Sequence, residues 1–311
     1  MILSVSRRTD IPAYYSKWFL KRLSEGYALV RNPMNYHSVS KINLSPEIVD
    51  CIVFWSKNPE PMVKYLTNID DKYMYYFQYT INAYNKDVEP NIPSLNDRIR
   101  TFINLSERLG KERVIWRYDP IILTDIYTSD WHEKMFSYIA DRLKGYTNNC
   151  VFSFVDMYDK IKFNMRNLRY RDIDKESINS LAECFAQIAE SKKICLKTCS
   201  EDIDFSELGI QHSCCIDPEL ISKLINSNIK EKKDKNQRES CGCVESIDIG
   251  QYNTCQNSCL YCYANYSQDS VKANCFKHDI NSPLLIGNLE VEDKISERKV
   301  ESLKDNQLRF F

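Results

Sequence analysis

The sequence predicts an α/β fold built on a parallel sheet, because short apolar runs alternate with amphipathic helical patterns along most of the chain. The runs are rich in Val, Ile, Phe, Tyr and Trp, a composition typical of buried strands. Repeated strand–helix units indicate parallel strands joined by right-handed crossovers, which commonly close into a barrel. We therefore expect a complete or partial (β/α) TIM-like barrel. A doubly wound open sheet is the alternative.

The predicted strands share high β-propensity and a length of a few residues. In chain order they are 2–6 (ILSVS), 51–55 (CIVFW), 73–81 (YMYYFQYTI), 113–118 (RVIWRY), 150–155 (CVFSFV), 194–198 (ICLKT) and 246–250 (SIDIG). A further run at 27–31 (YALVR) predicts a hairpin with 37–42 (HSVSKI).

Apolar residues recur at helical spacing between these runs, which indicates helices that pack one face on the sheet. The stripes are Tyr15, Trp18, Phe19 and Leu23, then Ile99, Phe102 and Ile103, then Met135, Phe136, Ile139 and Leu143, then Ile178, Leu181, Phe185 and Ile188. Core packing explains all of them, and none needs a functional interpretation.

Residues 1–225 therefore form the predicted barrel body, and residues 241–311 form a cysteine-rich segment that completes it. Between them, 226–240 (NSNIKEKKDKNQRES) is highly charged and has Ile229 as its apolar residue. Such a segment is typical of a solvated linker. The alternative is a basic loop that touches an anionic ligand.

The composition excludes several classes of protein. Hydrophobic residues make up 43% of 311 residues, enough for a sizeable core. Lys plus Arg number 42 against 43 for Asp plus Glu, so net charge does not indicate nucleic-acid binding. Arg7, Arg8 and Asp10 interrupt the first apolar run too early for a secretion signal, and no run is long enough to span a membrane. We expect a cytoplasmic protein with reduced thiols.

Five cysteines lie close together near the C-terminal end, in "CGC" (241–243) and "CQNSCLYC" (255–262). An odd total of 13 cysteines and a reducing compartment argue against disulfides. Cys259 and Cys262 have the spacing of a zinc knuckle, but structural zinc takes four ligands. Three close thiols without an obvious fourth favour an iron–sulfur cluster with one open iron.

The C-x3-C-x2-C spacing of Cys255, Cys259 and Cys262, with aromatic Tyr261 before the last cysteine, resembles the signature of radical S-adenosylmethionine enzymes. The resemblance implies that the three cysteines hold a [4Fe-4S] cluster, that S-adenosylmethionine chelates its open iron, and that Tyr261 lies by the adenine. The wider pattern "CGCVESIDIGQYNTCQNSCLYCYAN", together with "SVSRRTDIPAYY", resembles the bacterial domain of unknown function 1848 family.

The motif's place in the chain differs from the superfamily pattern, in which it follows the first barrel strand. A circular permutation of the barrel explains this order: 246–250 is then the usual first strand placed last, and 2–6 is the usual second strand placed first. The chain also lacks a Gly-Gly pair, so the superfamily's glycine-rich contact to the methionine amino group is absent.

Four other thiols add up to a candidate second metal site: Cys199, Cys215, Cys241 and Cys243. Four thiolates suit either an auxiliary iron–sulfur cluster or a zinc ion. Cys215 is preferred over Cys214 because it directly precedes a helix start. The alternative is that Cys199 and the Cys214/Cys215 pair are small buried residues.

Polar residues that follow predicted strands are candidates for ligand binding, since barrel active sites lie at the carboxyl ends of strands. They are Arg7, Arg8, Asp10, Lys57, Asn58, Arg117, Asp119 and Asp156. The alternative is that some of them are helix caps or members of surface ion pairs. A cationic mouth of this kind would favour an anionic substrate or the carboxylate of S-adenosylmethionine.

Together these observations predict an iron–sulfur enzyme that resembles the radical S-adenosylmethionine superfamily. The resemblance implies reductive cleavage of S-adenosylmethionine, hydrogen abstraction from an unidentified substrate, and a flavodoxin- or ferredoxin-type reductant. Two alternatives belong to other classes: a zinc-binding interaction or nucleic-acid module on a barrel, and an iron–sulfur electron carrier.

Overall fold

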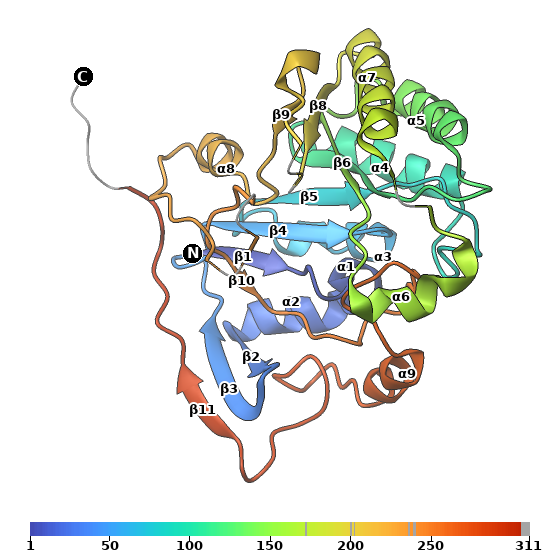
Figure 1. Cartoon of the computed structure of the whole chain (residues 1–311). Helices are drawn as coiled ribbons and strands as arrows, with labels where there is room; N and C mark the ends of the chain where they lie inside the picture. Colours follow the sequence, from blue (N-terminus) through green and yellow to red (C-terminus); the bar gives the residue numbers. More distant parts are fainter. Residues whose placement is uncertain (172, 200, 202, 236, 239–240, 306–311) are drawn as a thin grey trace.

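The computed structural model describes residues 1–171, 173–199, 201, 203–235, 237–238 and 241–305 (Figure 1). Its main sheet has eight strands in the order β10-β1-β4-β5-β6-β7-β8-β9, and every ladder in it is parallel. The strands are β1 (Ile2–Val5), β4 (Cys51–Ser56), β5 (Tyr75–Thr80), β6 (Val114–Ile121), β7 (Asn149–Phe154), β8 (Cys195–Thr198), β9 (Gln211–His212) and β10 (Ile247–Asp248). The predicted α/β class with a parallel sheet is confirmed. Within the described residues, no ladder joins β9 to β10.

The helices follow the strands in the predicted alternation. They are α1 (Ile11–Tyr14), α2 (Ser16–Glu25), α3 (Glu60–Val63), α4 (Leu95–Leu109), α5 (Ser129–Leu143), α6 (Asp159–Met165), α7 (Lys175–Ser191), α8 (Pro218–Ile225) and α9 (Gln268–Phe276). Short 3-10 turns lie at Leu66–Asn68, Arg166–Leu168 and Ser206–Leu208. Most residues of the predicted apolar stripes lie on the buried faces of α2, α4, α5 and α7. Ile103, Met135, Ile178 and Ile188 are only partly buried.

The strands bury side chains on both faces of the sheet, as parallel strands do when each face is covered. On β4, Ile52 and Phe54 join the core that includes the buried residues of α2, α4, α5 and α7. Cys51 and Val53 point to the other face and join a second core with α8 and the segment around Cys241 and Cys243. Because strand side chains alternate between faces, one sheet supports two separate cores. The cysteine-bearing segment covers the second face.

Two strand pairings join the beginning of the chain to its end. Strand β10 lies beside β1 as a parallel neighbour, with Leu3 opposite Ile247 and Ser4 opposite Asp248. This pairing confirms the predicted neighbourhood of "SIDIG" and "ILSVS". The predicted hairpin is also confirmed: β2 (Tyr27–Asn32) runs antiparallel to β3 (Asn35–Asn43). A third strand, β11 (Lys294–Glu297), adds to β3 in this small sheet.

Part of the charged segment after α8 packs against its neighbours. Ile229 is buried and forms an isolated bridge with Lys304. Asp234 is buried too, and its amide donates to the carbonyl of Cys243 at 3.0 Å. None of the helices in the described part of the chain combines the length and the apolar content needed to cross a bilayer.

A buried histidine makes the stability of this fold dependent on pH. His132 on α5 is fully buried, its Nδ1 2.9 Å from the hydroxyl of Tyr118 and its Nε2 3.0 Å from the carbonyl of Ile122. Burial lowers the pKa of His132 to about 4. Between this value and the ordinary pKa near 6.5, the unfolded chain binds a proton that the folded chain does not. The folded state therefore loses stability as pH falls through this window.

We expect His132 to contribute a loss of about 2 kcal/mol in unfolding free energy between pH 7.5 and pH 5. Urea titrations at both pH values should show a smaller loss in His132→Gln than in the wild type. His37→Gln is the matched control, because the His37 side chain is 45% exposed. An unchanged pH dependence in His132→Gln would contradict this explanation.

Candidate functional site

A cavity of about 600 Å³ lies at the carboxyl ends of the parallel strands. Its wall includes residues that follow or end β1, β4, β5, β6, β7 and β8, together with the loop after β10. This size is ordinary for a small-molecule site. Of the candidate site residues predicted from the sequence, all but Asn58 line this cavity. Seven of them are cysteines: Cys199, Cys215, Cys241, Cys243, Cys255, Cys259 and Cys262. The sequence places these residues in eight separate segments, and the fold brings them to one cavity.

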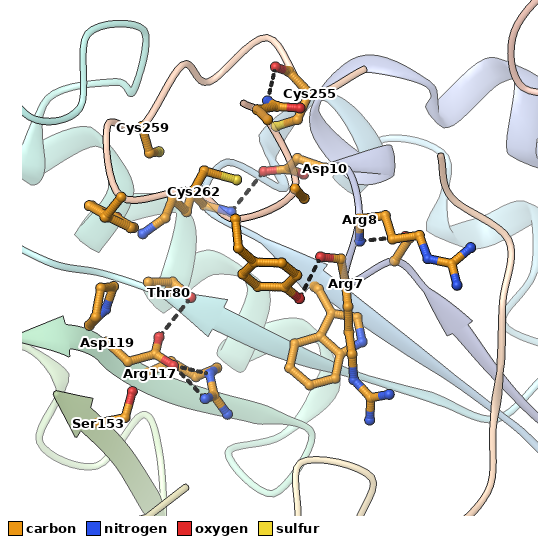
Figure 2. A pocket seen from close by; sticks show the side chains of 18 of the residues that line it. Arg7, Arg8, Asp10, Thr80, Arg117, Asp119, Ser153, Cys255, Cys259 and Cys262 are labelled. Carbon is orange, nitrogen blue, oxygen red and sulfur yellow. Dashed lines mark hydrogen bonds and ion pairs between the residues drawn. The ribbon is translucent and has the colours of Figure 1, made fainter. Parts of the chain in front are cut away.

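The first group of thiols lies on the loop that follows β10, as Figure 2 shows. Cys255 and Cys259 are buried and Cys262 is partly buried. The loop turns tightly, since the amide of Cys262 donates to the carbonyl of Cys259 at 3.1 Å. The side chain of Asn265 donates to the carbonyl of Cys255 at 2.5 Å. The three thiols are thus held on one short, internally bonded loop.

Burial raises the pKa of all three thiols, because it disfavours the thiolate. Their mutual repulsion adds to the effect: charge on Cys262 and on Cys259 raises the pKa of Cys255 further. At Cys259 and Cys262, the Lys57 ammonium opposes the rise in pKa. A bound metal is the partner that stabilises several buried thiolates at once.

Two carboxylates hold this loop against the neighbouring strand ends. Asp248 accepts hydrogen bonds from the Ser6 hydroxyl at 2.6 Å and from the Arg7 amide at 2.8 Å. Gly250 follows, and a Cβ there would lie 2.0 Å from the Ser6 hydroxyl, so only glycine fits. The fit explains how the backbone after β10 can approach the loop after β1 so closely.

Asp10 is the second anchor. Its Oδ1 accepts from the Ser56 hydroxyl at 2.7 Å and from the Ala13 amide at 3.0 Å. Its Oδ2 accepts from the Lys57 amide at 2.9 Å and from Asn257 at 3.0 Å. Burial raises the pKa of Asp10, although these four donors oppose the shift. Since both oxygens already have two donors, Asp10 links three loops rather than offering a free acceptor to a ligand.

The second group of thiols lines another part of the wall. The sulfur of Cys199, just after β8, lies 2.9 Å from that of Cys215. Hydrogen-bond interactions of the side chains also link Cys215 to Cys243 and Cys243 to Cys241. The predicted gathering of these four cysteines therefore occurs. Cys214, the neighbour of Cys215, instead points its sulfur toward the backbone at Gly242.

Two arginines face the second group. Arg117 on β6 donates from Nη1 to the Cys215 sulfur at 2.9 Å, and its Nε donates to Asp119 at 3.0 Å. Burial lowers the pKa of Arg117, but Asp119 and the thiols outweigh it and leave the pKa well raised. The Arg7 guanidinium lies 3.7 Å from Asp234 and 5.1 Å above the Trp55 ring. Its Nη2 is buried and has no hydrogen-bond partner within the described residues.

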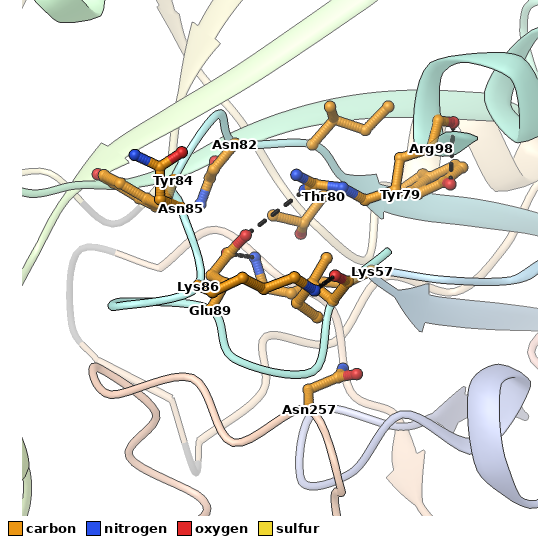
Figure 3. A network of polar contacts seen from close by, with 12 residues as sticks. Lys57, Tyr79, Thr80, Asn82, Tyr84, Asn85, Lys86, Glu89, Arg98 and Asn257 are labelled. Atoms are coloured by element: carbon orange, nitrogen blue, oxygen red, sulfur yellow. Dashed lines mark hydrogen bonds and ion pairs between the residues drawn. The ribbon is translucent and has the colours of Figure 1, made fainter. Parts of the chain in front are cut away.

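Glu89, Lys57 and Arg98 form a buried ion cluster that was not predicted from the sequence (Figure 3). Glu89 is 1% exposed and pairs with Lys57 at 3.0 Å and with Arg98 at 3.5 Å. The Tyr261 hydroxyl donates to the same carboxylate. Burial alone would raise the pKa of Glu89, but the two cations hold it below its ordinary value. Of the remaining candidates in the cavity wall, Arg8 lies 5.2 Å above the ring of Tyr252, and Asp156 pairs with Arg238 at 2.6 Å.

Comparisons with known proteins show a family but no activity. A family model described as "Domain of unknown function (DUF1848)" matches residues 2–264. No curated protein matches the chain. Among solved structures, one from Bacteroides thetaiotaomicron described as "a putative alpha-L-fucosidase" is similar to this chain at 11% identity. The match covers 72% of this chain and 84% of that one with a TM-score of 0.24.

We expect Glu89→Gln to lower the free energy of unfolding by about 3–5 kcal/mol, because it leaves Lys57 and Arg98 buried without their shared anion. Urea unfolding at neutral pH measures the loss. Glu112→Gln is the matched control: Glu112 pairs with Lys223 at 2.9 Å on the surface, where a pair contributes about 1 kcal/mol or less. Equal losses in the two variants would show that the buried cluster does not stabilise the fold.

Proposed function

This chain belongs to the DUF1848 family, and from its site we propose that it is an iron–sulfur enzyme of the radical S-adenosylmethionine type. One observation carries the proposal. Three cysteines with C-x3-C-x2-C spacing lie on the loop directly after β10 and line a cavity at the carboxyl ends of parallel strands. This is the position in which an α/β enzyme binds its ligands.

The donor set suits a [4Fe-4S] cluster with one iron left open. Cys255, Cys259 and Cys262 supply three soft thiolates. Burial raises the pKa of Cys259 and Cys262, and Lys57 opposes this rise. When bound and reduced, the cluster would supply the electron that cleaves S-adenosylmethionine and so yields the radical that abstracts hydrogen from the substrate. The chain's own residues would bind and orient the reactants and exclude water.

The neighbouring side chains suit an anionic or zwitterionic ligand. The unpartnered Nη2 of Arg7 is available to a carboxylate at the cavity wall. Tyr261 keeps its ring at the cavity while Glu89 holds its hydroxyl, which supports the role beside an adenine that the motif implies. Asp119 lines the cavity with 18% of its side chain exposed, so it is better placed than the buried Asp10 to accept from a ribose hydroxyl.

The strand order supports a permuted relation to the superfamily barrel. On this proposal, β10 corresponds to the first barrel strand and β1 to the second, with the sheet as a partial barrel. Their parallel pairing is what such a permutation requires. The proposal also includes a reducing compartment such as the cytoplasm and a flavodoxin- or ferredoxin-type reductant.

The proposal is tested by replacing Cys255, Cys259 and Cys262 together with alanine. Protein purified without oxygen should lose about four irons and four sulfides per chain relative to the wild type. Cleavage of S-adenosylmethionine by dithionite-reduced protein should disappear with them. Cys184→Ser on α7 is the control and should keep both.

Two results would refute the proposal. One is unchanged iron in the triple variant, or zinc as the metal lost from it. The other is a wild-type protein that has the cluster but neither binds nor cleaves S-adenosylmethionine, which would favour an electron carrier.

A further inference from the structure

The proposed function gives no role to the second group of thiols. Their arrangement is nevertheless that of a metal-binding site. Cys199 follows β8, Cys215 precedes α8, and Cys241 and Cys243 precede β10; the four pack together on one face of the sheet. Cys215, Cys241 and Cys243 are at most 5% exposed. Chance burial of free cysteines does not require four sulfurs from separate parts of the chain to gather in one place, whereas a thiolate metal site does.

The backbone fixes the contact between the two segments. The amide of Val244 donates to the carbonyl of Ile216 at 3.3 Å, and the amide of Ile216 donates to the sulfur of Cys243 at 3.4 Å. Two side chains from β5, Tyr76 and Gln78, donate to the carbonyl of Cys215 at 2.8 and 2.9 Å. Amide donation to a ligand sulfur, and hydrogen bonds that hold the backbone of a ligand residue, are typical of metal centres.

The charges around the group suit a thiolate-bound centre. Arg117 donates to the Cys215 sulfur at 2.9 Å. Arg7 lines the same cavity with a buried, unpartnered nitrogen, and its charge interacts with Cys243 and Cys215. Four thiolates bring a large negative charge into a buried position, and two arginines there offset it. Buried neutral thiols would need neither cation.

The arrangement of the sulfurs distinguishes a cluster from a single ion. A tetrahedral ion with sulfur ligands at ~2.3 Å requires every pair of sulfurs to lie within about 4 Å. In the described residues, the group of His, Cys, Asp and Glu ligand atoms found within 4.8 Å of one another is His37, Glu290 and Glu292, which contains no cysteine. The four thiols form an open chain, Cys199–Cys215–Cys243–Cys241. An open chain of thiols can spread around a cluster, and the 2.9 Å contact between Cys199 and Cys215 lengthens when the two thiolates bind different irons.

We infer that Cys199, Cys215, Cys241 and Cys243 hold a second iron–sulfur cluster, with Arg117 as the hydrogen-bond donor to one of its sulfur ligands. The two thiol groups line one cavity, so a molecule bound there would contact the surroundings of both centres. The inference rests on different residues from the proposed function, and either can fail without the other.

The test uses the full chain with Cys255, Cys259 and Cys262 already replaced by alanine, so that the second site alone is measured. After anaerobic reconstitution with iron and sulfide, this protein should hold about four irons and four sulfides. Adding Cys241→Ser and Cys243→Ser to this variant should abolish the binding of iron and of sulfide. Adding Cys184→Ser or Cys195→Ser should leave both unchanged, because neither residue lines the cavity.

A triple variant that is folded by circular dichroism but binds no iron would overturn the inference. So would binding of one zinc without sulfide, or a Cys199–Cys215 disulfide under anaerobic conditions. Because the added serines could impair folding, Arg117→Lys in the triple-alanine background provides a second measurement. It should keep the iron and lower the reduction potential of the cluster, since hydrogen bonds to sulfur set that potential. An unchanged potential would contradict the contact between Arg117 and the cluster.

Discussion

The parallel pairing of β10 with β1 is the constraint on which the site depends. Two residues of each strand form the ladder, and Asp248 extends it by accepting from Ser4, Ser6, Arg7 and Gly250. The pairing places the loop after β10 at the same edge of the sheet as the loops after β1 and β4. Without it, the first three cysteines would have no strand to position them, and Asp10 would have no partner in Asn257.

A second constraint is the neutralisation of buried charge. The chain has a net charge of only −1, yet its cavity concentrates seven thiols beside Arg7, Lys57 and Arg117. Each cation is committed to an anion as well: Asp234, Glu89 and Asp119, respectively. The cavity therefore keeps its cations fixed in place before any ligand arrives. Preorganised charge of this kind lowers the cost of binding an anion or a thiolate-ligated metal.

The sequence predicted the class of fold well because strand and helix patterns are local. The runs at 51–55 and 150–155 each became strands almost residue for residue. The neighbourhood of β1 and β10 was predicted from the motif's resemblance to a barrel enzyme, not from periodicity. Strands β9 and β11 were missed, since two exposed residues and a charged run carry no apolar alternation.

The site was predictable where chemistry depends on residue type and spacing, as for the cysteines and for polar residues after strands. Glu89 was not, because it stands in a polar loop and two of its partners, Lys57 and Tyr261, are distant in the chain. Asn257 and Asp248 were missed for the same reason. Their roles depend on contacts between loops that are far apart in the sequence, and no local sequence pattern predicts such contacts.

The two pairings between the chain's beginning and its end also determine when the protein can mature during translation. Strands β1 and β3 leave the ribosome early, but their partners β10 and β11 are made more than 200 residues later. Long-range pairing of this kind is slow, and the open edge of β1 stays exposed to other chains until then. The nascent chain thus needs protection of that edge through most of its synthesis. Depletion of chaperones should therefore lower the yield of folded protein without destabilising molecules that have already folded.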